Sequence, residues 1–243
     1  MQASQNNSSP LKIKEFRHFL SMRVFITFAF LIQYVVAGWE IYSITKDPLS
    51  LGLIGLAEAI PAIGIALYAG HLADISNKRN LLIAALCGMF LSSAGLTIFT
   101  SDYMQEMNSD DVTVKLMYLF IFTTGLARGF YAPTATSFIV QLVRPTATPK
   151  SPEGDLSSSK VLFQERNFDA IDEDELIDGE SKKINDQILV RASTINSTVW
   201  QMSAIIGPAL GGFIYAGFGM TFSMYCVLGC ILLGIIFMTF IKS

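Results

Sequence analysis

Four ionisable side chains interrupt the long apolar stretches of the chain: Glu40, Glu58, Asp74 and Arg128. In the hydrocarbon region of a membrane such a group is costly unless water or an opposite charge compensates it. Residues of this kind therefore mark proton or substrate pathways in membrane proteins. They are the first candidates for chemistry in this sequence.

Arg128 and Glu58 are the candidates that lie deepest in their stretches. Arg128 stays protonated at any accessible pH, so it needs water, an anion or a carboxylate beside it. We expect it to bind an anionic substrate or to tune a nearby acid, with a structural ion pair or a clamp on backbone carbonyls as the alternative. Glu58 is the acid expected to load and release a proton, or else a buried carboxyl that holds a bend at Pro61. Glu40 is a second candidate for proton uptake, although solvation near the membrane surface would also account for it.

Transmembrane helices are the elements expected to hold these side chains. The 243 residues are 51% hydrophobic and 15% charged, with a mean hydropathy of +0.47, whereas soluble domains have about a quarter charged residues. A helix needs about 20 apolar residues to cross a bilayer, and none of the apolar stretches alternates like a barrel strand. This composition excludes a soluble globular enzyme and predicts an all-α membrane protein with six spans. The expected spans are Val24–Thr45, Leu49–Ala69, Leu81–Thr100, Leu116–Leu142, Thr194–Ala216 and Phe218–Ile241.

Lysine and arginine residues are concentrated on one side of this arrangement. The N-terminal tail carries Lys14, Arg17 and Arg23, and the connection between spans two and three carries Lys78 and Arg79. Because cytoplasmic connections are enriched in these residues, we expect both ends of the chain in the cytoplasm.

The expected organisation has four parts. A cytoplasmic tail covers 1–22, spans one to four cover 23–143, a polar and acidic loop covers 144–191, and spans five and six cover 192–243. The loop has few large apolar residues to bury, so we expect disorder, with a short amphipathic helix over 161–176 as the exception. It is either a docking segment for a cytoplasmic partner or a solvated insertion.

Motifs of enzymatic chemistry are absent from the sequence. It has no Walker loop, no His-Glu-x-x-His, no Cys-x-x-Cys and no nucleophile elbow. Its three cysteines lie in apolar runs and give no disulfide framework. We therefore expect no enzymatic activity, no cofactor, no metal site and no nucleic-acid partner.

The fifth expected span carries small residues four apart. Ser203, Gly207 and Gly211 form one bare helix face, with Pro208 and Gly212 beside it. Such a face lets another helix approach closely. Ordinary tight packing is the alternative to a functional contact.

The connection between spans two and three carries a recognisable motif. It reads Gly70-His-Leu-Ala-Asp74-Ile-Ser-Asn77-Lys78-Arg79. This resembles the signature loop of the major facilitator superfamily, Gly-x-Leu-Ala-Asp-Arg-x-Gly-Arg-Arg/Lys, with an isoleucine and Asn77 replacing the usual arginine and glycine. Asparagine is the best substitute for glycine where a turn needs positive φ.

Three further stretches resemble the same superfamily. Residues 125–133, Gly-Leu-Ala-Arg-Gly-Phe-Tyr-Ala-Pro, look like span four of exporters related to the enterobactin and macrolide efflux proteins. Residues 207–212, Gly-Pro-Ala-Leu-Gly-Gly, are similar to the span-five antiporter motif, although Ser203 replaces its leading glycine. Residues 45–52 resemble the short outer turn after span one.

The resemblance implies one half of a major facilitator fold in the inner membrane of a cell. It implies proton-driven alternating access, with spans one and four lining a central cavity. Asp74 would latch the cytoplasmic side against a second six-span half, assisted by Lys78 and Arg79. The sequence corresponds to the first half on this resemblance, so we expect Asp74 to lack a covalently linked partner and the bare face of span five to stay open.

Three functions follow, in order of preference. The first is the N-terminal half of a proton-coupled exporter of small amphipathic compounds such as drugs or siderophores, in which Glu58 or Glu40 takes up the proton, Arg128 sets its affinity and Asp74 gates. The second is a homodimeric half-transporter. The third is a non-transporting scaffold whose acidic loop recruits a partner. The expected partners are the missing half or a second copy, the substrate, protons and the lipid bilayer.

Overall fold

The computed structural model describes residues 10–101, 109–143 and 173–241, and every regular element in these ranges is a helix. A short 3-10 helix, η2 (Pro10–Lys12), precedes α1 (Lys14–Thr45). The other helices are α2 (Pro48–Ile75), α3 (Lys78–Phe99), α5 (Asp110–Val143) and α6 (Glu173–Thr239). The expectation of an all-helical chain is confirmed.

Within the described residues, four helices are long and apolar enough to cross a membrane. They are α1, α2, α3 and the Asp186–Thr239 portion of α6. α5 is long but is not among them, because Arg128 and several hydroxyl side chains lower its hydropathy. α6 is interrupted at Gly219, whose backbone has φ 77° and ψ −175°, so it consists of two rods that meet at a bend. The number of membrane crossings therefore remains a prediction.

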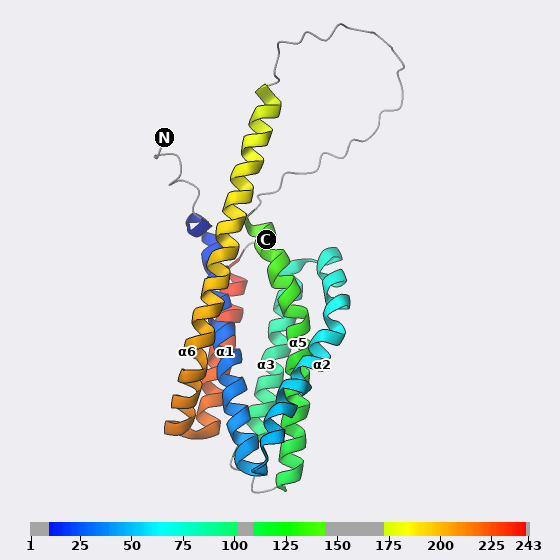
Figure 1. Ribbon diagram of the computed structural model, residues 1–243, viewed down its shortest axis with the longest axis vertical. Helices are drawn as coiled ribbons and strands as arrows, with labels where there is room; N and C mark the ends of the chain where they lie inside the picture. The colour runs from blue at the N-terminus through cyan, green and yellow to red at the C-terminus, as the bar shows by residue number, and fades with distance from the viewer. Residues whose placement is uncertain (1–9, 102–108, 144–172, 242–243) are drawn as a thin grey trace.

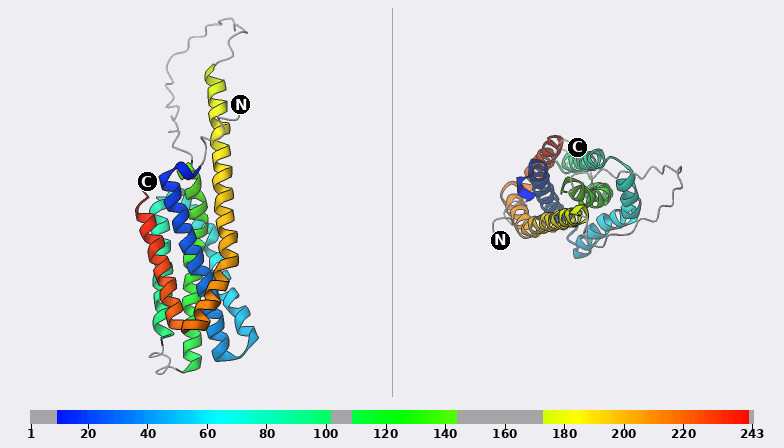
Figure 2. Two further views of the ribbon diagram at one scale, coloured as in Figure 1. Left: turned by 90° about the vertical axis from the view of Figure 1, so that its left-hand side faces the viewer. Right: turned by 90° about the horizontal axis from the view of Figure 1, so that it is seen from above.

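The helices run side by side as a bundle (Figure 1). The most extensive contacts join α1 to α6 on one side, and α2 and α3 to α5 on the other. α2 leans across the bundle, and its Pro48 end lies close to the end of α1. The first turns of α6 extend beyond the other helices, as Figure 1 and the left view of Figure 2 show.

Two helices extend into segments that the sequence analysis expected to be a tail and a loop. α1 begins at Lys14, and Phe16, Phe19 and Met22 of the expected tail are fully buried. The expected loop over 144–191 is helical from Glu173 onward. Residues 144–172, which hold most of the helix expected at 161–176, lie outside the described residues.

Two tight connections are built by local side-chain capping. Lys46 adopts the left-handed conformation at φ 54° and ends α1, and the Asp47 side chain then accepts a hydrogen bond from Leu49 N at 3.0 Å. Asn77 caps α3 by accepting from the backbone N–H groups of Arg79 and Asn80. Its φ is −64°, so the expectation that asparagine supplies a positive φ there is wrong: the side chain is needed as a helix cap.

The small residues of the expected fifth span pack against α1. A methyl group added at Gly207 would lie 2.8 Å from Leu31 Cβ, and one added at Gly211 would lie 3.2 Å from Ile32 Cα. Ser203, one turn earlier, is buried as well. The expectation that this face stays open is therefore wrong, because α1 of the same chain covers it.

The other two residues of that motif lie beside this contact. Pro208 and Gly212 are half-buried, and a methyl group at Gly212 would meet no atom within 4 Å. Within this motif, the close approach to α1 is therefore made at Gly207 and Gly211.

Candidate functional site

An ion pair between α2 and α5 forms the centre of the candidate site. Arg128 donates from Nη1 to Oε1 of Glu58, and the guanidinium lies over the ring of Phe30 of α1, 3.3 Å from its centroid. The Glu58 side chain is 10% exposed, whereas the Arg128 side chain is 35% exposed. The carboxylate is therefore enclosed by the helices, while the arginine reaches a more open side of the bundle.

Two glycines on α5 bring α2 close enough for this pair to form. A methyl group at Gly125 would overlap the carbonyl oxygen of Glu58 and lie 2.9 Å from Pro61 Cγ. One added at Gly129, a turn later, would lie 3.0 Å from the carbonyl oxygen of Ala62. The two glycines flank Arg128, so the helix approach and the ion pair occupy the same turn of α5.

These glycines were missed as site residues, although a signal for them is present. Gly125 and Gly129 are four apart within an expected span, which is the spacing that promotes close helix contact in membranes. The same spacing had been noted only in span five. Phe30, which covers the guanidinium, has no signal in the sequence, because an aromatic residue in an apolar run is ordinary.

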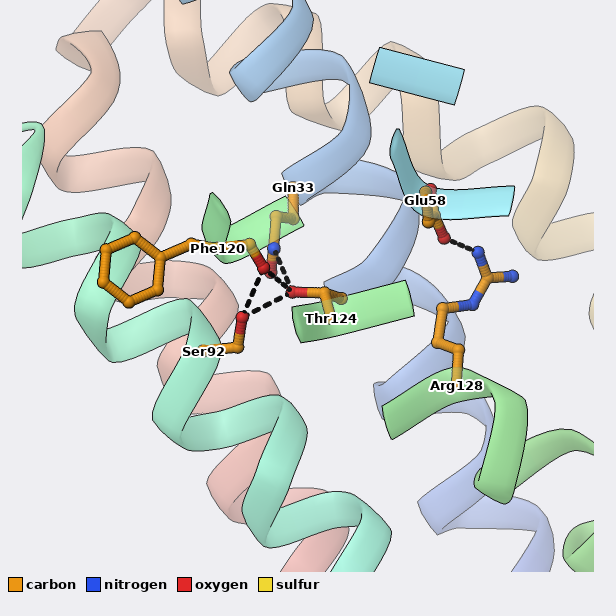
Figure 3. A network of polar contacts seen from close by, with 6 residues as sticks. All are labelled: Gln33, Glu58, Ser92, Phe120, Thr124 and Arg128. Carbon is orange, nitrogen blue, oxygen red and sulfur yellow. Dashed lines mark hydrogen bonds and ion pairs between the residues drawn. The ribbon is translucent and has the colours of Figure 1, made fainter. Parts of the chain in front are cut away.

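A buried network of uncharged polar side chains lies beside the ion pair (Figure 3). Gln33 of α1 donates to Thr124 Oγ1 of α5 at 3.4 Å and accepts from Ser93 Oγ of α3 at 2.6 Å. Ser92 Oγ lies 2.8 Å from Thr124 Oγ1 and donates to the Phe120 carbonyl at 2.6 Å. The network therefore joins three helices, and each of its side-chain members is at most 6% exposed.

The network and the ion pair are neighbours on α5. Thr124 and Arg128 are four residues apart, which places them one turn apart on the same helix face. A cavity of about 20 Å³ between them is lined by Gln33, Thr124 and Glu58, among others. The network and the carboxylate of the ion pair therefore face the same small cavity.

Glu40 lies in a different place. It is 10 residues beyond Phe30 on α1, about 15 Å away at 1.5 Å per residue. Its carboxylate is 9% exposed and accepts a hydrogen bond from the Tyr215 hydroxyl of α6 at 2.9 Å. Plain solvation of Glu40 is therefore excluded, and the structure does not bring Glu40 together with Arg128.

The candidate gating residues lie at the junction of α2 and α3. Asp74 is exposed in the last turn of α2, and Gly70 has open space around its α-carbon. Lys78 and Arg79 are half-buried in the first turn of α3. Arg79 donates from Nη2 to the Thr239 carbonyl at 3.1 Å, so it joins this junction to the last turn of α6. A cation is stabilised at this position by the negative end of the helix dipole.

The arrangement holds charges that can move a proton or bind an ion, and it shows no metal centre. In the ranges that the structure describes, no three His, Cys, Asp or Glu side chains lie close enough together to hold a metal ion. The chemistry available at the Glu58–Arg128 pair is the gain and loss of a proton and the binding of small molecules on its open side.

Comparison with protein-family models gives a match that covers more than half of the chain. A family model described as transmembrane secretion effector, of the major facilitator type, matches residues 5–151. This range contains α1, α2, α3 and α5 and therefore the whole ion-pair site. Neither the search of curated proteins nor the search of solved structures gave a match.

Proposed function

Because the chain belongs to the transmembrane secretion effector family of the major facilitator superfamily, we propose that it exports small amphipathic organic compounds by proton-coupled alternating access. The family assignment makes it a membrane transport protein of the secretion type. Proton coupling, the kind of compound and the direction of transport are parts of the proposal.

The Glu58–Arg128 ion pair is the observation that carries this proposal. The enclosed Glu58 carboxylate is paired with Arg128. A proton on Glu58 neutralises the carboxylate and so removes the charge attraction between α2 and α5 at this turn. Two helix arrangements that differ in this contact would then have different proton affinities, which is the linkage that a proton-driven cycle requires. Glu58 is a better proton site than Glu40, because Glu40 is bonded to Tyr215 away from Arg128.

The proposal also includes the orientation of the chain in the membrane and the second unit that it works with. We place both ends of the chain in the cytoplasm, with the bend at Gly219 separating spans five and six. A second six-span unit, either a fused half or another copy, completes the transport path. Asp74, exposed at the end of α2, is then available to gate against that unit, with Gly70, Lys78 and Arg79 shaping the junction.

Transport into everted membrane vesicles tests the proposal. Vesicles containing the full chain are energised to acidify their interior and are given rhodamine 6G, Hoechst 33342 or fluorescein as amphipathic dyes. We expect uptake of at least one dye, lost when a protonophore collapses the gradient and lost in the variants Glu58→Gln and Arg128→Gln. The variant Glu15→Gln removes an exposed carboxylate from the start of α1 and is expected to transport normally.

Two results would overturn the proposal. One is dye uptake that does not respond to the protonophore. The other is equal proton-dependent uptake in the wild-type protein and in Glu58→Gln, which would remove Glu58 from the coupling.

A further inference from the structure

A second feature lies on the open side of Arg128. A cavity of about 120 Å³ between α1, α5 and α6 is lined by two arginines, Arg23 and Arg128, and by the aromatic residues Phe30, Tyr131 and Trp200. In the sequence, Arg23 stands at the boundary between the expected tail, 1–22, and the first expected span. The structure instead places it in the bundle, more than two turns after the start of α1.

The charges around this cavity do not cancel. Arg128 is neutralised by Glu58. Arg23 has neutral partners in the part of the chain described here: its Nε donates to Asn196 Oδ1 at 3.2 Å, and its guanidinium lies 5.3 Å from the centroid of the Tyr131 ring. One positive charge is therefore left without an opposite charge at the cavity wall.

The remaining wall suits an aromatic or apolar body. Phe30 and Trp200 come from different helices and both line the cavity, and half of the Trp200 surface is exposed. A cavity of about 150 Å³ holds one benzene molecule, so this slightly smaller, open cavity has room for an anionic group and part of a ring. Guanidinium groups bind carboxylate and related oxyanions through paired N–H donors.

We propose that this cavity is a binding site for an organic anion, with a carboxylate or sulfonate at Arg23 and an aromatic body beside Trp200. The site exists whether or not the chain transports as proposed above. Protonation of Glu58 leaves Arg128 without its neutralising partner and adds a second positive charge to the wall. The anion therefore binds the protonated form more tightly, and it opposes the release of the proton from Glu58.

The tryptophans of the chain supply a direct assay. There are two, Trp39 and Trp200, so the variant Trp39→Phe leaves Trp200 as the only tryptophan reporter. In this background, 4-nitrobenzoate is titrated as a quenching anion, with uncharged 4-nitrobenzamide as the matched probe. We expect saturable quenching by the anion and only weak, non-saturating quenching by the amide.

Three variants test the charge argument. Asn196→Asp keeps Arg23 but places a carboxylate beside its guanidinium, which neutralises the charge. We expect the affinity for 4-nitrobenzoate to fall about tenfold or more, because one charge-assisted contact is lost. Arg23→Gln should do the same. Arg17→Gln removes an exposed arginine from the same helix and should leave binding unchanged. Because Asn196→Asp retains the arginine, its result stays interpretable if Arg23→Gln fails to fold.

Glu58→Gln separates this inference from the proposed function. It is expected to abolish proton-driven transport but to strengthen 4-nitrobenzoate binding severalfold. Equal quenching by the anion and the amide, or unchanged anion affinity in Asn196→Asp, would overturn the anion site. Neither result would bear on dye transport.

Discussion

Gly125 of α5 lies directly against the backbone carbonyl of Glu58 of α2, with no room for a methyl group between them. The contact is made three residues before Arg128, which pairs with the Glu58 side chain. Backbone proximity and charge pairing are therefore two aspects of one helix crossing. A change that moves the helices apart should weaken both.

Gly125→Ala is expected to destabilise the protein by about 1–3 kcal/mol, because the added methyl group overpacks this crossing. The measurement is the thermal unfolding midpoint of the purified protein in detergent. Gly64→Ala is the matched control, since a methyl group at Gly64 of α2 meets no atom within 4 Å. An equal fall in both midpoints would show that the α2–α5 crossing is not tight.

Removing one partner of the ion pair is expected to cost more than removing both. Arg128→Gln leaves a carboxylate that is enclosed by helices, at a cost of about 3–5 kcal/mol. Glu58→Gln should cost less, because the Arg128 side chain is 35% exposed. Its guanidinium also keeps its contact with the Phe30 ring. The double variant Glu58→Gln/Arg128→Gln should recover part of the loss in unfolding midpoint. Strictly additive losses would contradict the pairing.

Gln33→Leu is expected to lower stability by about 1–2 kcal/mol, because it leaves the Ser93 hydroxyl without its acceptor and Thr124 without one partner. Gln201→Leu makes the same chemical change at an exposed position on α6. Its unfolding midpoint should match that of the wild-type protein. If the two leucine variants behave alike, the network does not hold the three helices together.

The proposed orientation predicts which connections an impermeant reagent can reach. With the native cysteines replaced by serine, a cysteine at Lys46 should react with an impermeant maleimide in intact cells. A cysteine at Asn80, in the first turn of α3 after the connection that follows α2, should react only after the membrane is permeabilised. Both positions are exposed, so labelling reports the side of the membrane. The opposite pattern would reverse the proposed topology.

The second and third spans expected from the sequence agree well with helices of the structure. Leu49–Ala69 falls inside α2, and Leu81–Thr100 nearly coincides with α3. The start of α1 was placed too late because Lys14, Arg17 and Arg23 mask the buried positions between them. Hydropathy averages over such a turn, whereas packing depends on which individual side chains face the neighbouring helices.

The candidate site could be predicted in part. Glu58 and Arg128 stand out because a charge in an apolar run is costly, and the structure pairs them. Which helices face one another cannot be read from one sequence, so Gln33 and Gly125 were not connected to the pair. For the same reason the glycine face of span five was expected to be free, whereas α1 covers it.

Infrared difference spectroscopy of the reconstituted protein tests the role of Glu58 most directly. Spectra are recorded between alkaline and acidic buffer for the wild-type protein, Glu58→Gln and Glu40→Gln. We predict that a carboxylic acid C=O band appears on acidification in the wild-type protein and in Glu40→Gln, and that Glu58→Gln lacks this component. A Glu58→Gln spectrum that keeps the whole band would show that Glu58 does not take up the proton, which would contradict the proposed coupling.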